Sequence, residues 1–325
     1  MDDIETDNGE RSPLLDTHDN DGAVHEEVHP HATASEPSRS SSTSTATSSK
    51  PYAMAACLPV LCIPTLLLWQ FRGSTDAATM VWVYILTGTL GMAIFMVIQS
   101  VLAYLAFLLL FGSDTNEYII EFAKTENQIE DAAHQTRRQQ MSRRWQYWVF
   151  LFLFAFVMAG LLEEGLKYYA IVGARKYGKV DSERGQLTIA IAAGLGFATI
   201  ESIGFVYASC RSNESPARLA LTVFERVAFG VPIHAMGAAL TGVNLLARDF
   251  RHEPMTMWQA LREAALFHGL FDFALLATSA YNGNIGWIHP RKGFTGYLLL
   301  GVAFALVLGL AGVLVRRMQH YDLLF

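Results

Sequence analysis

Charged residues and cysteines are both scarce in this sequence. Charged residues make up 17% of its 325 positions, while hydrophobic residues make up 52%. Soluble domains carry about 25% charged residues, so this composition excludes an ordinary soluble domain and indicates several membrane spans. The three cysteines, Cys57, Cys62 and Cys210, form no CxxC pair and no even set. Their arrangement excludes a disulfide scaffold and a cysteine-based metal site.

The first 50 residues lack large apolar side chains and hold most of the acidity. They contain eleven Asp and Glu against three Lys and Arg, so the net charge of −6 leaves about +2 for the rest of the chain. Such a segment buries too little apolar surface to offset the entropy of ordering it, and we expect a disordered tail. It also lacks the basic and apolar regions of a cleavable signal peptide, so we expect the mature chain to keep it. Nothing in the charge pattern indicates a nucleic-acid partner.

One short motif in the tail predicts a cellular address. Residues 10–15 read ERSPLL, in which Glu10 precedes the pair Leu14 and Leu15. This resembles the acidic dileucine signal, which a cytosolic sorting adaptor reads, although six-residue matches also arise by chance. The motif predicts a cytosolic N-terminus and a vacuolar or endosomal membrane.

The remaining chain divides into apolar segments of membrane-spanning length. A bilayer core of about 30 Å requires roughly twenty helical residues. We therefore expect an all-α, polytopic transmembrane helix bundle of seven or eight spans, because the second segment is long for one helix and short for two. The expected spans are 53–71, 77–112, 147–173, 187–208, 219–247, 258–280 and 296–315.

These spans suggest a domain organisation. Residues 51–112 form N-terminal spans, and the polar stretch 113–146 is expected to be an extramembrane loop or helix. Residues 147–315 form a membrane-embedded core with the last span, and 316–325 a short C-terminal tail. Internal repeats are not evident, and the GLG at 194–196 lacks the third glycine of a dinucleotide motif. Its neighbouring alanines instead predict close helix packing.

Ionisable residues inside the spans are the main functional signal. A charge at a helix centre costs on the order of 2.5 to 3.5 kcal/mol in lipid, so these residues should face one another. Glu225, Arg226, Arg262 and Glu263 lie near span starts, where an interfacial or structural role is favoured. The deeper groups fall on four consecutive apolar segments, and they are Glu163, Glu164, Lys167, Glu201, His234, His268 and Asp272.

The first segment carries the motif EExxK. Lys167 lies four residues after Glu163 and three after Glu164, so it can pair with either carboxylate on a helix. We expect one glutamate to be held by the lysine. The other would remain unpaired in a low-dielectric cleft, where it could exchange protons.

The other three segments supply histidines and carboxylates. Glu201 lies among small residues, and His234 follows Pro232, whose missing N–H loosens the helix beside it. His268 and Asp272 share one helical face at i and i+4, which suits two ligands of one metal ion or a histidine oriented by a carboxylate. Each feature alone is more often a packing contact, so their concurrence is the evidence.

The order of these motifs resembles the PrsW family of intramembrane proteases, which is similar in turn to the CAAX-processing and Abi membrane proteases. The matching elements are EExxK, GFxxxE ending at Glu201, Arg226 followed by His234 and a glycine, and HxxxD at His268. The resemblance covers about residues 147–280, leaving out the tail and the first spans. The family's second motif usually ends in Glu-Asn, whereas here it reads Glu201-Ser202.

The resemblance implies hydrolysis of peptide bonds in membrane-protein substrates, within or near the lipid bilayer. It implies that the seven deep residues form the catalytic set: Glu163, Glu164, Lys167, Glu201, His234, His268 and Asp272. Two chemical versions remain open. In one, Glu163 or Glu164 activates water while both histidines polarise the carbonyl, and no metal is required. In the other, His234, His268 and a carboxylate from Asp272 or Glu201 bind Zn²⁺, and Glu163 takes the proton.

Two alternatives from other classes use the same residues. A proton- or cation-coupled carrier could employ the buried carboxylates and histidines as a relay. Carriers often show inverted repeats and paired broken helices, which this sequence does not display. An inactive protease-like scaffold that binds other membrane helices is the second alternative.

Overall fold

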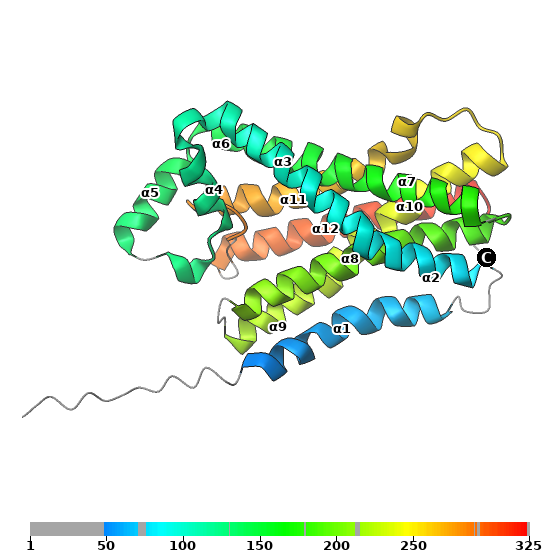
Figure 1. The fold of residues 1–325 in the computed structure, drawn as a ribbon, viewed down its shortest axis with the longest axis horizontal. Helices are drawn as coiled ribbons and strands as arrows, with labels where there is room; N and C mark the ends of the chain where they lie inside the picture. Colours follow the sequence, from blue (N-terminus) through cyan, green and yellow to red (C-terminus); the bar gives the residue numbers. More distant parts are fainter. Residues whose placement is uncertain are drawn as a thin grey trace, which may run out of the picture. The chain divides into compact units, whose positions relative to one another are not determined.

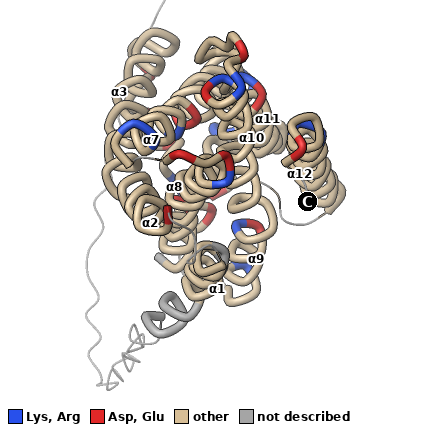
Figure 2. The backbone as a smooth tube through the Cα atoms, turned by 90° about the vertical axis from the view of Figure 1, so that its right-hand side faces the viewer, with Lys and Arg blue, Asp and Glu red and all other residues tan. Residues whose placement is uncertain are grey.

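The computed structural model describes residues 49–70, 76–129, 131–178, 180–211, 215–288, 290 and 293–323. Across these residues the chain forms helices and no strand, as the sequence predicts (Figure 1). Most of the tube in Figure 2 is tan, the colour of residues other than Lys, Arg, Asp and Glu, in keeping with an apolar bundle. The acidic tail and its ERSPLL motif lie outside the described residues.

Six helices in the described part of the chain are long and apolar enough to cross a membrane, judged by length and composition. A shorter apolar helix, α1 (Ser49–Gln70), precedes them, so each of the seven apolar segments is helical. With consecutive helical segments counted as one helix, the six helices are Ala77–Ala123, Trp145–Gly178, Glu183–Cys210, Pro216–Phe250, Met257–Tyr281 and Gly293–His320.

The long segment 77–112 forms one helix rather than two. It comprises α2 (Ala77–Leu86), the π-helical turn η1 (Thr87–Gly91) and α3 (Met92–Phe111) without a break. At about 1.5 Å per residue this helix is roughly 50 Å long, well beyond the thickness of a bilayer core. A single span of this length fits a membrane only when it is strongly tilted or extends past the lipid.

The polar stretch after α3 folds into short helices at one end of the long ones (Figure 1). A buried ion pair between Arg138 and Glu121 joins two of them, and Arg138 Nη2 also donates to the carbonyl of Ile285 at 2.7 Å. The stretch is thereby tied to the loop that follows α11. Its elements are η2 (Gly112–Asp114), α4 (Thr115–Ala123), η3 (Glu126–Gln128) and α5 (Ala132–Ser142).

The centre of the bundle is the pair α8 (Glu183–Arg211) and α10 (Val231–Phe250), which pack along each other. Gly194 makes this approach possible, because a Cβ there would lie 2.8 Å from Ala238 Cβ and 3.0 Å from the carbonyl carbon of His234. The alanines beside Gly194 are fully buried, which confirms the predicted close packing.

A second close approach brings α11 (Met257–Tyr281) onto the π-helical segment η4 (Leu153–Leu161). A Cβ on Gly160 would lie 2.7 Å from the carbonyl oxygen of Ala265, so only glycine fits there. Because Gly160 precedes the glutamate pair by one turn, this contact places the pair beside α11. The helix containing η4 begins with α6 (Trp145–Phe152) and continues as α7 (Leu162–Gly178).

The helix that carries His234 is irregular just before that residue. It starts as α9 (Pro216–Glu225), passes through the π-helical segment η5 (Arg226–Gly230) and continues as α10. Pro232 lies in the first turn of α10, directly after η5, and has no N–H to donate to the preceding turn. The loosening expected near Pro232 is therefore a wider turn immediately before it. The last helix, α12 (Gly293–His320), packs on α10 and α11.

Candidate functional site

Lys167 contacts both glutamates of α7, not one of them. Its Nζ lies 3.0 Å from Glu163 Oε1 and 2.8 Å from Glu164 Oε1, and all three side chains are buried. The expected division into one paired and one unpaired glutamate is wrong. The lysine extends back along its helix between the positions three and four residues earlier, so it reaches both carboxylates.

The side chain of His234, which α10 carries, contacts residues of both α7 and α8. Its Nε2 is 2.7 Å from Glu201 Oε2, and its Nδ1 is 2.9 Å from both Lys167 Nζ and Glu163 Oε1. The Nδ1 atom can accept a hydrogen bond from the ammonium or, when protonated, donate one to the carboxylate, but it cannot do both at once. The three groups therefore offer two proton arrangements within one fixed geometry.

Arg226 completes the contacts around Glu201. Its guanidinium pairs with the Glu201 carboxylate, and its Nε donates to Ser202 Oγ at 3.2 Å. Ser202, which stands where the family usually has asparagine, thus accepts a hydrogen bond from this arginine. The arginine was expected to have an interfacial or structural role, and the structure joins it to the site. Its position about two turns before His234 was the available signal.

His268 approaches the same two glutamates from α11. Its Nδ1 lies 2.9 Å from Glu164 Oε1, while its Nε2 lies 3.7 Å from Glu163 Oε2 and 3.6 Å from Asp272 Oδ2. Asp272 therefore stands beside the outer nitrogen of His268, one turn along the helix. Carboxylates in such positions orient imidazoles that bind metals or transfer protons.

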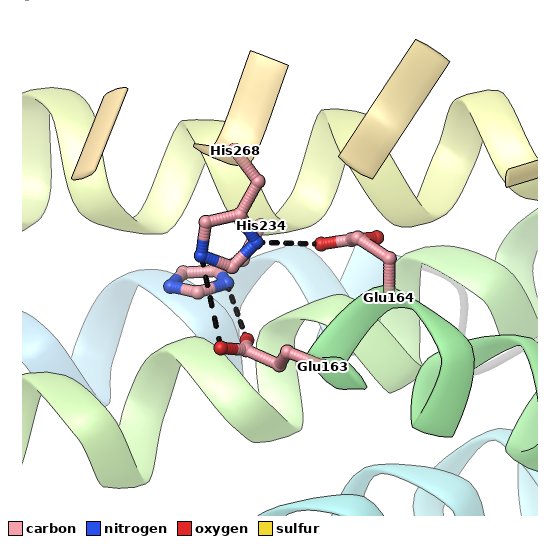
Figure 3. A group of neighbouring side chains, drawn as sticks. All are labelled: Glu163, Glu164, His234 and His268. Carbon is pink, nitrogen blue, oxygen red and sulfur yellow. Dashed lines mark hydrogen bonds and ion pairs between the residues drawn. The ribbon is translucent and has the colours of Figure 1, made fainter. Parts of the chain in front are cut away.

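Four side chains converge at the centre (Figure 3): the two imidazole rings lie one above the other, beside the two glutamates. The ring centroids are 4.9 Å apart and nearly perpendicular. Among the described residues, one ligand atom from each of these side chains lies within 4.8 Å of the others. The members are Glu163, Glu164, His234 and His268. Glu201 and Asp272, also expected as ligands, lie outside this group: Glu201 contacts His234 Nε2, and Asp272 lies near His268 Nε2.

The charges of the connected residues do not cancel. Four carboxylates and two permanent cations contact one another or the two histidines, so neutral imidazoles leave two negative charges in surplus. A buried surplus of this size calls for two protons or one divalent cation. The carboxylates are those of Glu163, Glu164, Glu201 and Asp272, and the cations are Lys167 and Arg226.

The centre has the donors for a zinc ion. Two imidazoles with one or two carboxylates are a known donor set for catalytic zinc. Within the described part of the chain, Glu164 Oε2 is buried without a hydrogen-bond partner. It faces Gly237 of α10, which has no side chain to cover it.

Together, the fold and the site define a helical membrane protein with a buried carboxylate and imidazole centre where four long helices meet. Residues 76–310 match the model of the PrsW family of intramembrane metalloproteases. Because the match covers well over half of the sequence, the chain belongs to this family. The resemblance carried by the motif order is confirmed. The matched range is wider than the expected 147–280, since it also takes in the long helix of α2 and α3.

A curated relative agrees with this assignment. Over 130 residues the chain is 32% identical to Protease PrsW of Clostridioides difficile (strain 630), which covers 38% of this chain. The match spans about half of the relative, 51% of its length. No solved structure matches the chain.

Proposed function

We propose that the chain is an intramembrane endopeptidase that hydrolyses peptide bonds of membrane-associated proteins. The observation that carries this proposal is the buried convergence of Glu163, Glu164, His234 and His268 from three helices within 4.8 Å. Hydrolysis requires a base for water and a group that stabilises the oxyanion, and these residue types supply both. Family membership supports the same reaction.

Glu163 is the proposed general base. Its carboxylate lies between the two histidines, at 2.9 Å from His234 Nδ1 and 3.7 Å from His268 Nε2. It accepts a proton from water as the water oxygen bonds to the scissile carbonyl carbon. When the C–N bond breaks, the same proton passes to the leaving amine, so the carboxylate is regenerated.

The histidines and Lys167 support this step. One imidazole N–H donates to the developing oxyanion, which draws charge from the carbonyl oxygen. Lys167 pairs with both Glu163 and Glu164 and so fixes their positions. Glu201 fixes the ring of His234 through the Nε2 atom of the histidine. These positioning contacts keep the base and the oxyanion donor in one geometry.

A zinc ion suits the same centre, and we propose that His234, His268 and the carboxylate of Glu164 would hold it, with Glu163 left as the base. In this proposal the expected ligands Asp272 and Glu201 contact the histidines and do not bind the ion. When bound, such an ion supplies Lewis acidity to a water or a carbonyl oxygen. It would also neutralise the two surplus negative charges of the group.

The test compares wild type with Glu163→Gln and Glu164→Gln at matched protein levels by quantitative profiling of membrane-protein N-termini. Glu163→Gln should remove specific cleavage products, because loss of a general base costs about 100-fold or more in rate. Glu263→Gln is the matched control. Glu263 does not belong to the centre, and its carboxylate pairs with Arg317 at a distance of 2.8 Å. Identical profiles for wild type and Glu163→Gln, with folded protein in both, would favour a carrier or a scaffold.

We further propose that the tail motif at Glu10, Leu14 and Leu15 binds a cytosolic adaptor and directs the protein to a vacuolar or endosomal membrane. The support is the ERSPLL sequence alone. Changing both leucines to alanine should move a fluorescent fusion to another membrane. Changing Val24 and Val28 to alanine is the control within the same tail.

A further inference from the structure

A second feature lies close to the catalytic centre: a cavity of about 430 Å³. This volume falls within the range of about 300 to 1,000 Å³ that is typical of ligand sites. Residues from α8, α9, η5, α11 and α12 line it, together with segment 122–126 and with Trp287, Ile288 and Pro290. None of the seven deep residues described above belongs to its lining.

Two helices carry the catalytic residues and the cavity lining on a single face. On α8, Phe205 lies one turn after Glu201. On α11, Phe271 and Leu275 follow His268 at i+3 and i+7. At about 1.5 Å per residue, the lining begins about 5 to 6 Å along these helices from the catalytic side chains. The cavity therefore adjoins the site along both helices.

Arg226 forms the boundary between cavity and centre. It lines the cavity, and its guanidinium also pairs with Glu201, which contacts His234 at 2.7 Å. The guanidinium carbon lies 4.6 Å from the ring centre of Phe205, a second lining residue. A group seated in the cavity is thus one side chain away from the residues that act on the peptide bond.

The chemistry of the walls selects an apolar occupant. The interior is formed mainly by aromatic and aliphatic side chains from the five helical elements and from the loop after α11. Besides Arg226 and Glu225, the charged lining residues lie in segment 122–126, where Glu126 pairs with Arg218 at 2.5 Å. The main apolar contributors are Phe205, Phe229, Phe271, Leu275, Trp287 and Leu299.

We propose that this cavity is the specificity pocket of the enzyme, which receives a large apolar side chain of the substrate at one fixed position beside the cleaved bond. The proposal rests on the proposed peptidase function and names its substrate class: polypeptides with Leu, Met or Phe at that position. Burial of such a side chain stabilises the bound substrate through the apolar area removed from water. Arg226 then links occupancy of the pocket to the position of Glu201.

Narrowing or widening the pocket tests the proposal. Ala303 lines the cavity on α12 and is 5% exposed, while Ala305 is exposed two residues further along. Ala303→Trp should fill the pocket, and Ala305→Trp is its matched control. Leu299→Ala enlarges the pocket from the same helix and acts in the opposite direction.

The purified full-length variants are incubated in micelles with a proteome-derived peptide library, and mass spectrometry identifies the new termini. Wild type should prefer Leu, Met or Phe at one position beside the cleaved bond. Ala303→Trp should reduce cleavage at those residues at least 10-fold relative to Ala or Ser, whereas Ala305→Trp keeps the wild-type preference. Leu299→Ala should shift the preference towards Phe and Trp.

The outcomes separate this proposal from the proposed function. A wild type whose termini match those of Glu163→Gln overturns both. Cleavage that Glu163→Gln abolishes, but with preferences unchanged in Ala303→Trp and Leu299→Ala, overturns the specificity pocket alone. Native mass spectrometry of the same samples adds one arm: a lipid displaced by Ala303→Trp without a change in preference identifies the cavity as a lipid site and also overturns the proposal.

Discussion

The Nε2 atom of His234 lies 2.7 Å from Oε2 of Glu201, and Arg226 reaches the same carboxylate oxygen from the turns that precede the histidine. Two points of one helix thus hold a carboxylate of its neighbour α8. This contact leaves Nδ1 of His234 facing Glu163 and Lys167. The orientation of the ring is therefore set from outside the four-residue group.

Arg226→Gln should lower kcat by about 10 to 100-fold, the range observed when outer partners of catalytic or metal-binding groups are removed. Glu201 would lose its cationic partner and its hold on His234. Arg226→Lys should restore part of the loss, and the pH profile of kcat should shift in Arg226→Gln. Steady-state kinetics on a substrate from the terminus profiling measures both. Arg251→Gln, which alters a pair with Glu183, is the control; equal kinetics in the two Gln variants would contradict this role.

Lys167→Met should destabilise the fold by about 3 to 5 kcal/mol, because it leaves two buried carboxylates without their cation. Adding Glu164→Gln should recover part of that stability, with a coupling of about 0.5 to 3 kcal/mol. Unfolding in detergent micelles gives the free energies. Lys176→Met, an exposed position of the same helix, should change little. Additive effects of Lys167→Met and Glu164→Gln would rule out the coupling.

Gly194→Val should reduce both stability and activity, whereas Gly204→Val on the same helix should reduce neither. A side chain at Gly194 overlaps α10 next to His234, while Gly204 has no atom within 4 Å of its Cβ position among the described residues. Overpacking costs about 1 to 3 kcal/mol, and here it also displaces the histidine. Thermal unfolding and cleavage rate are the measurements; a fully active Gly194→Val would show that the helix approach is not required.

If zinc occupies the centre, the purified chain should contain one ion, and chelation should remove the ion and the activity together. His234→Ala and His268→Ala should each lose the ion, because each removes one of the two imidazoles. His252→Ala is the control, since His252 is an exposed loop residue. Elemental analysis and cleavage rates after chelation and zinc addition provide the readouts. Full activity in a metal-free chain would favour the version in which Glu163 and the histidines act alone.

The sequence predicted the helical architecture and the contacts between site residues on the same helix, because both depend on local spacing. EExxK places Lys167 beside two glutamates, and HxxxD places His268 and Asp272 on one face. Seven apolar segments of sufficient length predicted the helices. These inferences require only the periodicity and length of a helix.

Features that depend on contacts between helices could not be read in this way. The spacing of Lys167 allows a bond to either glutamate. It does not show that the lysine contacts both of them, or that His234 of α10 reaches the same ammonium. Arg226 was placed near a span start, where its partner on another helix is invisible in the sequence. The single long helix of α2 and α3 packs along α8, a contact that no length rule predicts.

The π-helical segment η5 makes the number of residues, and not only their identity, a condition for function. A π-helical turn holds one residue more than an α-helical turn. Removing one residue between Arg226 and His234 would restore a regular helix and rotate Arg226 by about 100° away from Glu201. A deletion of this kind could leave the hydrophobic pattern and the fold intact. Insertions and deletions in this segment are therefore informative when family members are compared, because they mark chains in which the arginine and the histidine no longer share a partner.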